Sequence, residues 1–145
     1  VSRRVGQIFI ENAIRGRDLV IQGDGQDRID FTYIDDFTQG LIRTMMTDAS
    51  RGEIFNITYG NAQALNEVAA LVCEQFPGTQ VRYVERAAHV PERGTLDVSK
   101  ARELLAYEPK FPVAQGFPEY IDWYRDLFKN FSSDQLAHLE AQANE

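Results

Sequence analysis

Apolar residues recur along the chain at two spacings, and each spacing predicts a type of secondary structure. Spacings of three and four residues predict helices over residues 3–16, 36–47, 65–76 and 98–105, and a long helix that contains Phe117 and Phe128. Short apolar or alternating runs predict strands at 18–22, 28–34, 52–60 and 79–85. Because strands alternate with helices, we expect an α/β fold in which helices flank a small mixed sheet.

The stretch from residue 23 to residue 36, "GDGQDRIDFTYIDD", holds five aspartates and one arginine. Gly23 and Gly25 permit positive φ, which predicts a hairpin turn between the strands at 18–22 and 28–34. The stretch ends in an acidic pair, Asp35 and Asp36, and either residue is predicted to cap the helix that follows. Arg28 opens the second strand, and the local pattern leaves two alternatives: a solvated surface side chain or a bidentate fork for a phosphate.

The charge balance and the rare residues argue against several classes of protein. The net charge is −7 without a cationic run, which argues against a nucleic-acid partner. No apolar run approaches the roughly 20 residues of a membrane span. Cys73 is the single cysteine, which fits the reducing cytoplasm, and its helical pattern predicts a small core residue. His89 and His138 have no further ligands at zinc spacing, so we expect no metal site.

Three segments follow one another in an informative order. The first runs from a helix through "GDG", Arg28 and "FTYIDD"; the second is "GEIFNITYG"; the third is "DVSKARELLAYEP", followed by a helix with "YIDWY". Together, over residues 3–128, they resemble the C-terminal, substrate-binding part of the extended short-chain dehydrogenases/reductases, the NAD-dependent nucleotide-sugar epimerases and dehydratases. The resemblance implies a nucleotide-sugar-binding portion over 1–131 and a polar tail over 132–145.

The resemblance also implies a site for a UDP- or dTDP-linked sugar. In that family, the arginine after the glycine turn grips the diphosphate, and Arg28 occupies that position. A second arginine precedes the "DVSKA" helix; Arg93 is the first choice and Arg86 the alternative. Two guanidinium forks from opposite sides suit the two charges of a diphosphate. The strand before the turn is expected to line the nucleobase, through Val20, Ile21 and Gln22.

At several positions the chain departs from the family pattern. Gln22 stands where an aromatic residue is frequent, and Val90 stands near the usual place of an acidic residue that holds the ribose. Ala106 replaces the usual glycine of "L-G-y-x-P". Ala64 replaces a capping Ser or Thr, although Glu67 keeps the capping-box position.

The elements that carry the family's chemistry are missing from the sequence. Such enzymes bind NAD or NADP on an N-terminal G-x-x-G-x-x-G turn and use a Y-x-x-x-K pair; here Tyr107 precedes Lys110 by only three residues. We therefore expect no catalytic residue and no cofactor in this chain, with the N-terminal cofactor domain absent. The alternatives are a non-catalytic binding or oligomerisation module with the same fold, or one half of a split epimerase.

Two apolar segments, the helix over 36–47 and the strand "EIFNI", are expected to lie against the missing cofactor domain. Without that domain, they are expected to make the chain associate with a second copy as a homodimer.

Overall fold

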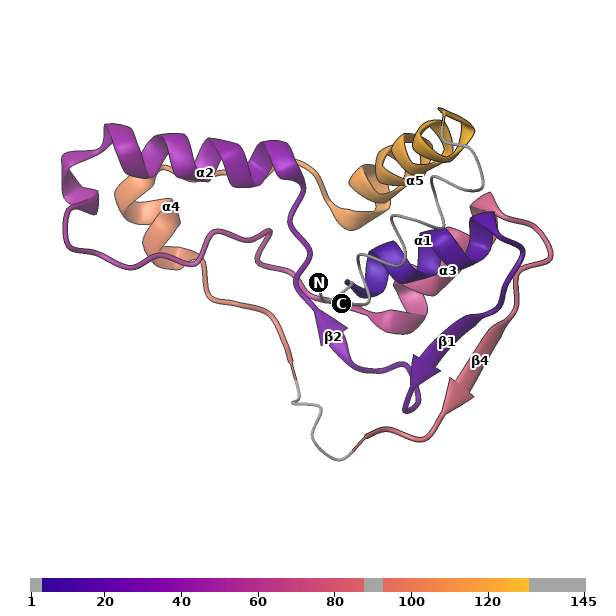
Figure 1. Cartoon of the computed structure of the whole chain (residues 1–145). Helices are drawn as coiled ribbons and strands as arrows, with labels where there is room; N and C mark the ends of the chain where they lie inside the picture. Colours follow the sequence, from indigo (N-terminus) through magenta and orange to yellow (C-terminus); the bar gives the residue numbers. More distant parts are fainter. Residues whose placement is uncertain (1–3, 88–92, 131–145) are drawn as a thin grey trace.

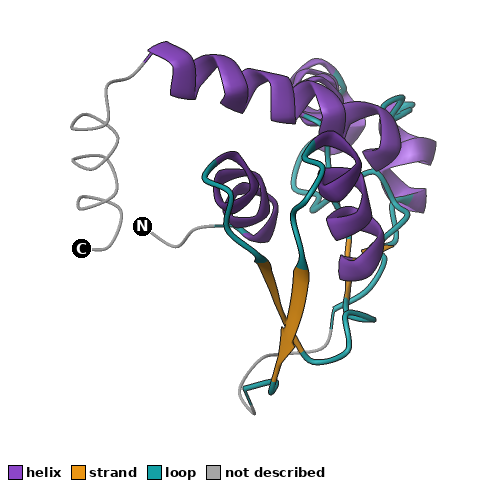
Figure 2. Ribbon diagram, turned by 90° about the vertical axis from the view of Figure 1, so that its right-hand side faces the viewer, coloured by secondary structure: helices purple, strands orange, loops and turns teal. Residues whose placement is uncertain are grey.

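A computed structural model describes residues 4–87 and 93–130, and Figures 1 and 2 show it from two sides. Along the chain the elements are α1 (Val5–Ile14), β1 (Leu19–Gln22), β2 (Arg28–Ile29), α2 (Ile34–Met46), the 3₁₀ turn η1 (Asp48–Ser50), β3 (Gln63–Ala64), α3 (Leu65–Gln75), β4 (Val81–Val84), α4 (Ser99–Leu105) and α5 (Val113–Asn130). This alternation confirms the α/β class. The predicted tail over 132–145 lies outside the described residues, as do His89, Val90 and His138.

The strands form two small sheets. β1 pairs in parallel with β4, and β2 pairs antiparallel with β3. The predicted hairpin between 18–22 and 28–34 is therefore wrong. The N–H of Gly23 donates to the carbonyl of Val84 at 2.8 Å, so the end of β1 stays with β4 while the chain turns away toward β2.

Two predicted strands are shorter or absent. Only Arg28 and Ile29 of the 28–34 segment are paired as a strand, and no strand lies within 52–60. Ile54 in the second segment is 87% exposed, which a buried strand would not allow. Both segments instead run as extended connections between the sheets and the helices.

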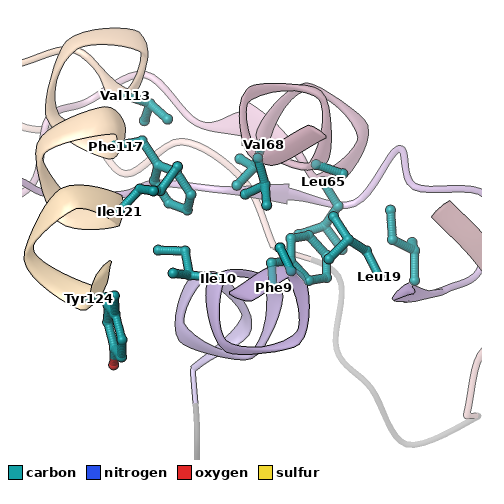
Figure 3. Close-up of a cluster of buried hydrophobic side chains, with 13 residues drawn as sticks. Phe9, Ile10, Leu19, Leu65, Val68, Val113, Phe117, Ile121 and Tyr124 are labelled. Atoms are coloured by element: carbon teal, nitrogen blue, oxygen red, sulfur yellow. The ribbon is translucent and has the colours of Figure 1, made fainter. Parts of the chain in front are cut away.

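The main core lies between α1, α3, α5 and the inner face of β1. Figure 3 shows side chains from α1, α3 and α5 pointing toward one another. The buried residues of this core are Phe9, Ile10, Ala13, Leu19, Ile21, Leu65, Val68, Ala69, Val72, Val113, Phe117, Ile121 and Tyr124. Each large apolar side chain buried here contributes roughly 1.5–3 kcal/mol, so this cluster is the main source of stability.

A second, smaller cluster holds α2 and α4 together. Ala101, Leu105 and Tyr107 are buried in it, and Phe55 and Ile57 pack against them half-buried. In Figure 1, α2 and α4 lie side by side, away from α1, α3 and α5. Within the described ranges, no helix has the length and apolar character needed to cross a membrane.

The start of α2 differs from the predicted cap. Tyr33 is the N-cap residue and makes no side-chain capping bond, while Asp35 and Asp36 lie in the first turn. Asp36 is only 3% exposed, and its two carboxylate oxygens accept the backbone N–H groups of Lys110 and Phe111, at 2.7 and 2.9 Å. The prediction that Asp35 or Asp36 caps α2 is wrong, because Asp36 holds a different segment.

The starts of α3 and α4 agree better with the sequence. The N–H of Ala64 donates to Oε2 of Glu67 at 2.7 Å, which confirms that Glu67 keeps its half of the capping box. The N–H of Ser99 donates to Oδ1 of Asp97 at 2.9 Å, and this bond lowers the pKa of Asp97. α4 begins at Ser99, one residue after the predicted start.

Candidate functional site

Arg28 lies at the start of β2, where pairing with β3 fixes its backbone. Arg28 is opposite Ala64 in the register, and its Nη2 donates to the carbonyl of Ala62 at 2.5 Å. This bond engages one N–H of a guanidinium that has five, and the residue is exposed. The backbone of Arg28 is therefore held in place by strand pairing, while its side chain is accessible to solvent and to a ligand.

The segment before α4 lies against the same strand. The N–H of Ala62 donates to Oγ1 of Thr95 at 3.0 Å, so Ala62 contacts both Thr95 and Arg28. Arg93 is two residues before Thr95, which is at most roughly 7 Å of backbone, and it is exposed. The structure thus places Thr95, two residues after Arg93, at the same residue that Arg28 contacts.

Asp30 holds these segments together and was missed by the sequence analysis. Its carboxylate accepts the hydroxyl of Thr58 and the backbone N–H groups of Gly60 and Leu96, each at 3.1 Å. One carboxylate thereby fastens the loop before β3 and the loop before α4 to the end of β2. In the sequence, Asp30 alternates with the apolar residues Ile29 and Phe31. That pattern predicted only a solvent-facing residue of a strand, and not a role in joining two loops.

Arg86 is held by a carboxylate of the glycine turn. Its Nη1 lies 2.6 Å from Oδ1 of Asp27, and both side chains are partly buried. Its stem passes close to the turn, since a Cβ added at Gly23 would lie 3.7 Å from the Cβ of Arg86. Arg86 therefore braces the turn that precedes Arg28, and a ligand would have to compete with Asp27 for it.

The three residues of β1 expected to line the nucleobase divide between two faces. Ile21 is 1% exposed and points into the core, so only its backbone can face a ligand. Val20 and Gln22 are exposed on the opposite face, and in the register they pair with Arg82 and Val84. Arg82 is engaged by Asp18 at 3.0 Å. The open face of β1 and β4 thus offers a short platform that is partly apolar and carries the amide of Gln22.

A cavity of about 500 Å³ lies elsewhere, between α5 and the segment before α2. Its walls include Phe31, Tyr33, Phe111, Phe117, Tyr120 and Trp123, but none of the three predicted arginines. The hydroxyl of Tyr33 donates to Oε2 of Glu119 at 2.5 Å, and this bond raises the pKa of Tyr33 to about 12. Arg4 is the one cationic side chain among the described residues that line this cavity, whereas two are expected at the diphosphate site.

The described residues do not fit a nicotinamide cofactor. A dinucleotide pyrophosphate is cradled where a glycine turn opens a helix N-terminus, whereas Gly23 and Gly25 lead into β2. No group of three or more metal-ligating side chains is assembled in the part of the chain that the structure describes. Cys73 is half-buried against the core, and burial raises the pKa of its thiol, which disfavours the nucleophilic thiolate.

The alternation of helices and strands places this chain in the class of α/β proteins. The family model of the NAD-dependent epimerases and dehydratases matches residues 2–58. UDP-glucuronic acid decarboxylase 6 of Arabidopsis thaliana is 35% identical over 116 residues, which are 79% of this chain and 33% of that protein.

Solved structures agree with these sequence matches. An epimerase of Methanothermobacter thermautotrophicus has a TM-score of 0.82 and 28% identity, covering 88% of this chain and 38% of its own. UDP-glucose 4-epimerase of Thermotoga maritima, solved with UDP-glucose, has a TM-score of 0.79 and 28% identity, covering 88% and 41%. The chain belongs to the NAD-dependent epimerase/dehydratase family, the extended short-chain dehydrogenases/reductases. It spans about a third of the length of the curated relatives that it matches.

Proposed function

We propose that this chain is the nucleotide-sugar-binding portion of an NAD-dependent epimerase or dehydratase, and that it binds a UDP-linked sugar. The observation that supports the proposal is the shared contact at Ala62: Arg28 donates to its carbonyl, and Thr95, two residues after Arg93, accepts its N–H. A diphosphate carries about two charges, and two planar forks give it both charge compensation and a fixed orientation.

Arg93 is a better second ligand than Arg86. Arg86 already makes a close ion pair with Asp27, and losing that pair would release the turn before Arg28. Arg93 is exposed, and no hydrogen bond or ion pair of Arg93 is found among the described residues. It can therefore turn toward a diphosphate without breaking an existing contact.

The nucleoside is proposed to lie over the open face of β1. Val20 can contact the base, and the amide of Gln22, with two donors and one acceptor group, can hydrogen-bond its polar edge. Relatives named for their action on UDP-sugars favour uridine, and a dTDP-glucose dehydratase of Streptomyces venezuelae is also similar in structure. We propose a UDP-hexose or UDP-hexuronic acid as the substrate class, and dTDP serves as the comparison ligand.

Redox chemistry on the sugar would need the nicotinamide, which supplies hydride transfer when it is bound in this family. The described residues provide no cradle for it, so the proposed role of these 145 residues is to bind and orient the nucleotide sugar. The cytoplasm is the proposed location, because the single thiol needs no oxidising compartment. A non-catalytic binding module is the second candidate, and Gln22 in place of a stacking aromatic residue favours it.

Titration calorimetry with UDP and dTDP tests this proposal on wild type, Arg28→Ala and Arg28→Lys. A charged hydrogen bond is worth about 1.5–3 kcal/mol, so Arg28→Ala should weaken UDP binding roughly tenfold to a hundredfold. Arg28→Lys should recover only part of the loss, because an ammonium lacks the planar fork. Arg51→Ala is the matched control: it removes the same charge from a side chain that is 84% exposed and pairs with Asp48.

Equal binding by wild type and Arg28→Ala would show that Arg28 does not hold the diphosphate. If neither protein binds UDP at millimolar concentration, the nucleotide-sugar proposal fails and the binding-module alternative takes its place.

A further inference from the structure

The hydroxyl of Thr95 lies at the point where the segment before α4 meets the residue that Arg28 contacts. Its Oγ1 accepts the N–H of Ala62 at 3.0 Å, and the carbonyl of Ala62 accepts Nη2 of Arg28 at 2.5 Å. A hydroxyl has two acceptor lone pairs and one O–H donor, so the bond from Ala62 leaves the donor unused. No acceptor for that O–H is found among the described residues, and Thr95 is exposed.

The two bonds at Ala62 limit the distance between the donors of Thr95 and Arg28. The nitrogen and the carbonyl oxygen of one residue are joined by the N–Cα, Cα–C and C=O bonds, so Oγ1 of Thr95 and Nη2 of Arg28 are at most roughly 10 Å apart. A diphosphate carries oxygens on two phosphorus atoms and can accept from donors that are not adjacent. A hydroxyl and a guanidinium at this separation can therefore contact one diphosphate.

The backbone on the C-terminal side of Thr95 is also held in place. The N–H of Leu96 donates to Oδ2 of Asp30 at 3.1 Å, and the carbonyl of Asp97 accepts Nδ2 of Asn56 at 2.8 Å. Together with the bond to Ala62, three consecutive residues are bonded to segments at or near β2 and β3. A donor that is fixed before the ligand arrives loses little conformational entropy on binding.

The charges of this region are compatible with an anion. The carboxylate of Asp30 accepts three hydrogen bonds, and that of Asp97 accepts the N–H of Ser99 at 2.9 Å, so donors partly compensate both negative charges. Arg28 is exposed and supplies a full positive charge. A neutral hydroxyl then adds a second donor without adding a carboxylate or displacing an ion pair.

We propose that the hydroxyl of Thr95 donates a hydrogen bond to a diphosphate oxygen of the nucleotide sugar, beside the contact made by Arg28. The inference rests on the proposed function, because it names a further ligand residue of the same site. Oγ1 of Thr95 then accepts the N–H of Ala62 and donates to the ligand at the same time. Binding breaks no hydrogen bond of the described chain, and a hydrogen bond to a charged oxygen is one of the stronger kinds.

A matched pair of substitutions separates a ligand role from a structural role. Thr95→Asn and Thr95→Asp have nearly the same shape, and each has a side-chain oxygen that can accept the N–H of Ala62. The amide also carries donors, whereas the ionised carboxylate carries none and repels a phosphate. In titration calorimetry with UDP, Thr95→Asn should bind like wild type, and Thr95→Asp should bind roughly tenfold to a hundredfold more weakly than Thr95→Asn.

The control is the same pair of substitutions at another exposed threonine, Thr38 in α2. Thr38→Asn and Thr38→Asp should bind UDP equally, because mobile ions screen charges beyond about 8 Å at physiological ionic strength. If Thr38→Asp weakens binding as much as Thr95→Asp does, net charge is the cause and the inference is overturned.

The remaining outcomes separate this inference from the proposed function. Equal affinity of Thr95→Asn and Thr95→Asp for UDP overturns the role of Thr95. The proposed function still stands in that case if Arg28→Ala binds UDP more weakly than wild type. A wild type that binds no UDP at millimolar concentration overturns both.

Discussion

Ala106 holds a backbone conformation that suits glycine better, and replacing it by glycine should stabilise the chain. Among the described residues it is the one non-glycine residue with positive φ, at φ 51° and ψ 38°. The left-handed conformation costs an L-residue roughly 1–2 kcal/mol. The position ends α4, and the N–H of the following residue, Tyr107, donates to the carbonyl of Ala101 at 3.2 Å.

The expected stabilisation is the free energy of the relieved backbone strain minus an entropic cost, because glycine gives the unfolded chain greater conformational freedom. That freedom costs about 0.4–1 kcal/mol. The methyl group of Ala106 is exposed, so its removal sacrifices little packing. The net effect of Ala106→Gly is a stabilisation of about 0.5–1 kcal/mol.

Urea unfolding followed by circular dichroism measures this effect as a higher midpoint at unchanged slope. The melting temperature should rise by roughly 2–4 °C for a change near 1 kcal/mol. Ala70→Gly is the control, because Ala70 is exposed in the middle of α3; it should destabilise by roughly 0.5–1 kcal/mol. If Ala106→Gly lowers stability as Ala70→Gly does, the strain argument is refuted.

Two further predictions concern single hydrogen-bonding groups. Asp36→Asn leaves one acceptor oxygen for two backbone N–H groups, so it should lower the free energy of unfolding by about 1.5–3 kcal/mol. The control Asp35→Asn changes an exposed neighbour and should alter that free energy by less than about 0.5 kcal/mol. Similar losses for the two variants in urea unfolding would contradict the bridging role of Asp36. Glu119→Gln should move the ionisation of Tyr33 from about pH 12 toward its ordinary pKa of 10.0, because the hydrogen bond to Glu119 is the largest cause of the shift. The raised pKa favours the folded chain below pH 10, and this contribution is lost as the pH rises toward 12. Ultraviolet titration detects the change. Tyr107 is the internal reference, because burial raises its pKa to about 12 as well. If both tyrosines of the variant still ionised near pH 12, the prediction would be contradicted.

The helices were predictable because their signal is local. The spacings that predicted helices over 3–16 and 65–76 correspond to α1 and α3, whose buried residues recur on one side. The segments 18–22 and 79–85 likewise contain β1 and β4. Within such a short element, side-chain periodicity follows directly from backbone geometry.

Strand pairing was not predictable in the same way. The alternation of Ile29, Phe31 and Tyr33 predicted a strand, yet the rings of Phe31 and Tyr33 pack on residues outside any sheet. The Phe31 ring lies 6.0 Å from that of Phe117, and the Tyr33 ring lies 4.6 Å from that of Phe111. Alternation thus reports which side chains share a face, but it does not report whether the backbone between them finds a hydrogen-bonding partner.

The candidate site was likewise predictable from the sequence only in part. Arg28 and Arg93 were identified as candidates from a resemblance in motif order, and the structure adds the contacts that join the segments carrying them. Asp30 joins positions 58, 60 and 96, and Asp27 holds Arg86. These contacts depend on how distant segments return to β2, which a local pattern in one sequence does not contain.

The helix α2 was predicted from its apolar spacing, but the orientation of its apolar side was not. Its spacing correctly predicted a helix and the residues that share its apolar side. The pattern could not say which side meets the chain, because an amphipathic helix packed on its own core and one packed on another polypeptide have the same period. Two residues on the polar side, Gly40 and Asp36, indicated that this side faces the chain. Glycine permits the close approach of another segment, and a buried carboxylate needs backbone donors nearby. A helix fixed in this way by its polar side keeps its apolar side turned away from the described core, and the exposed side chains of Leu41 and Met45 report that orientation.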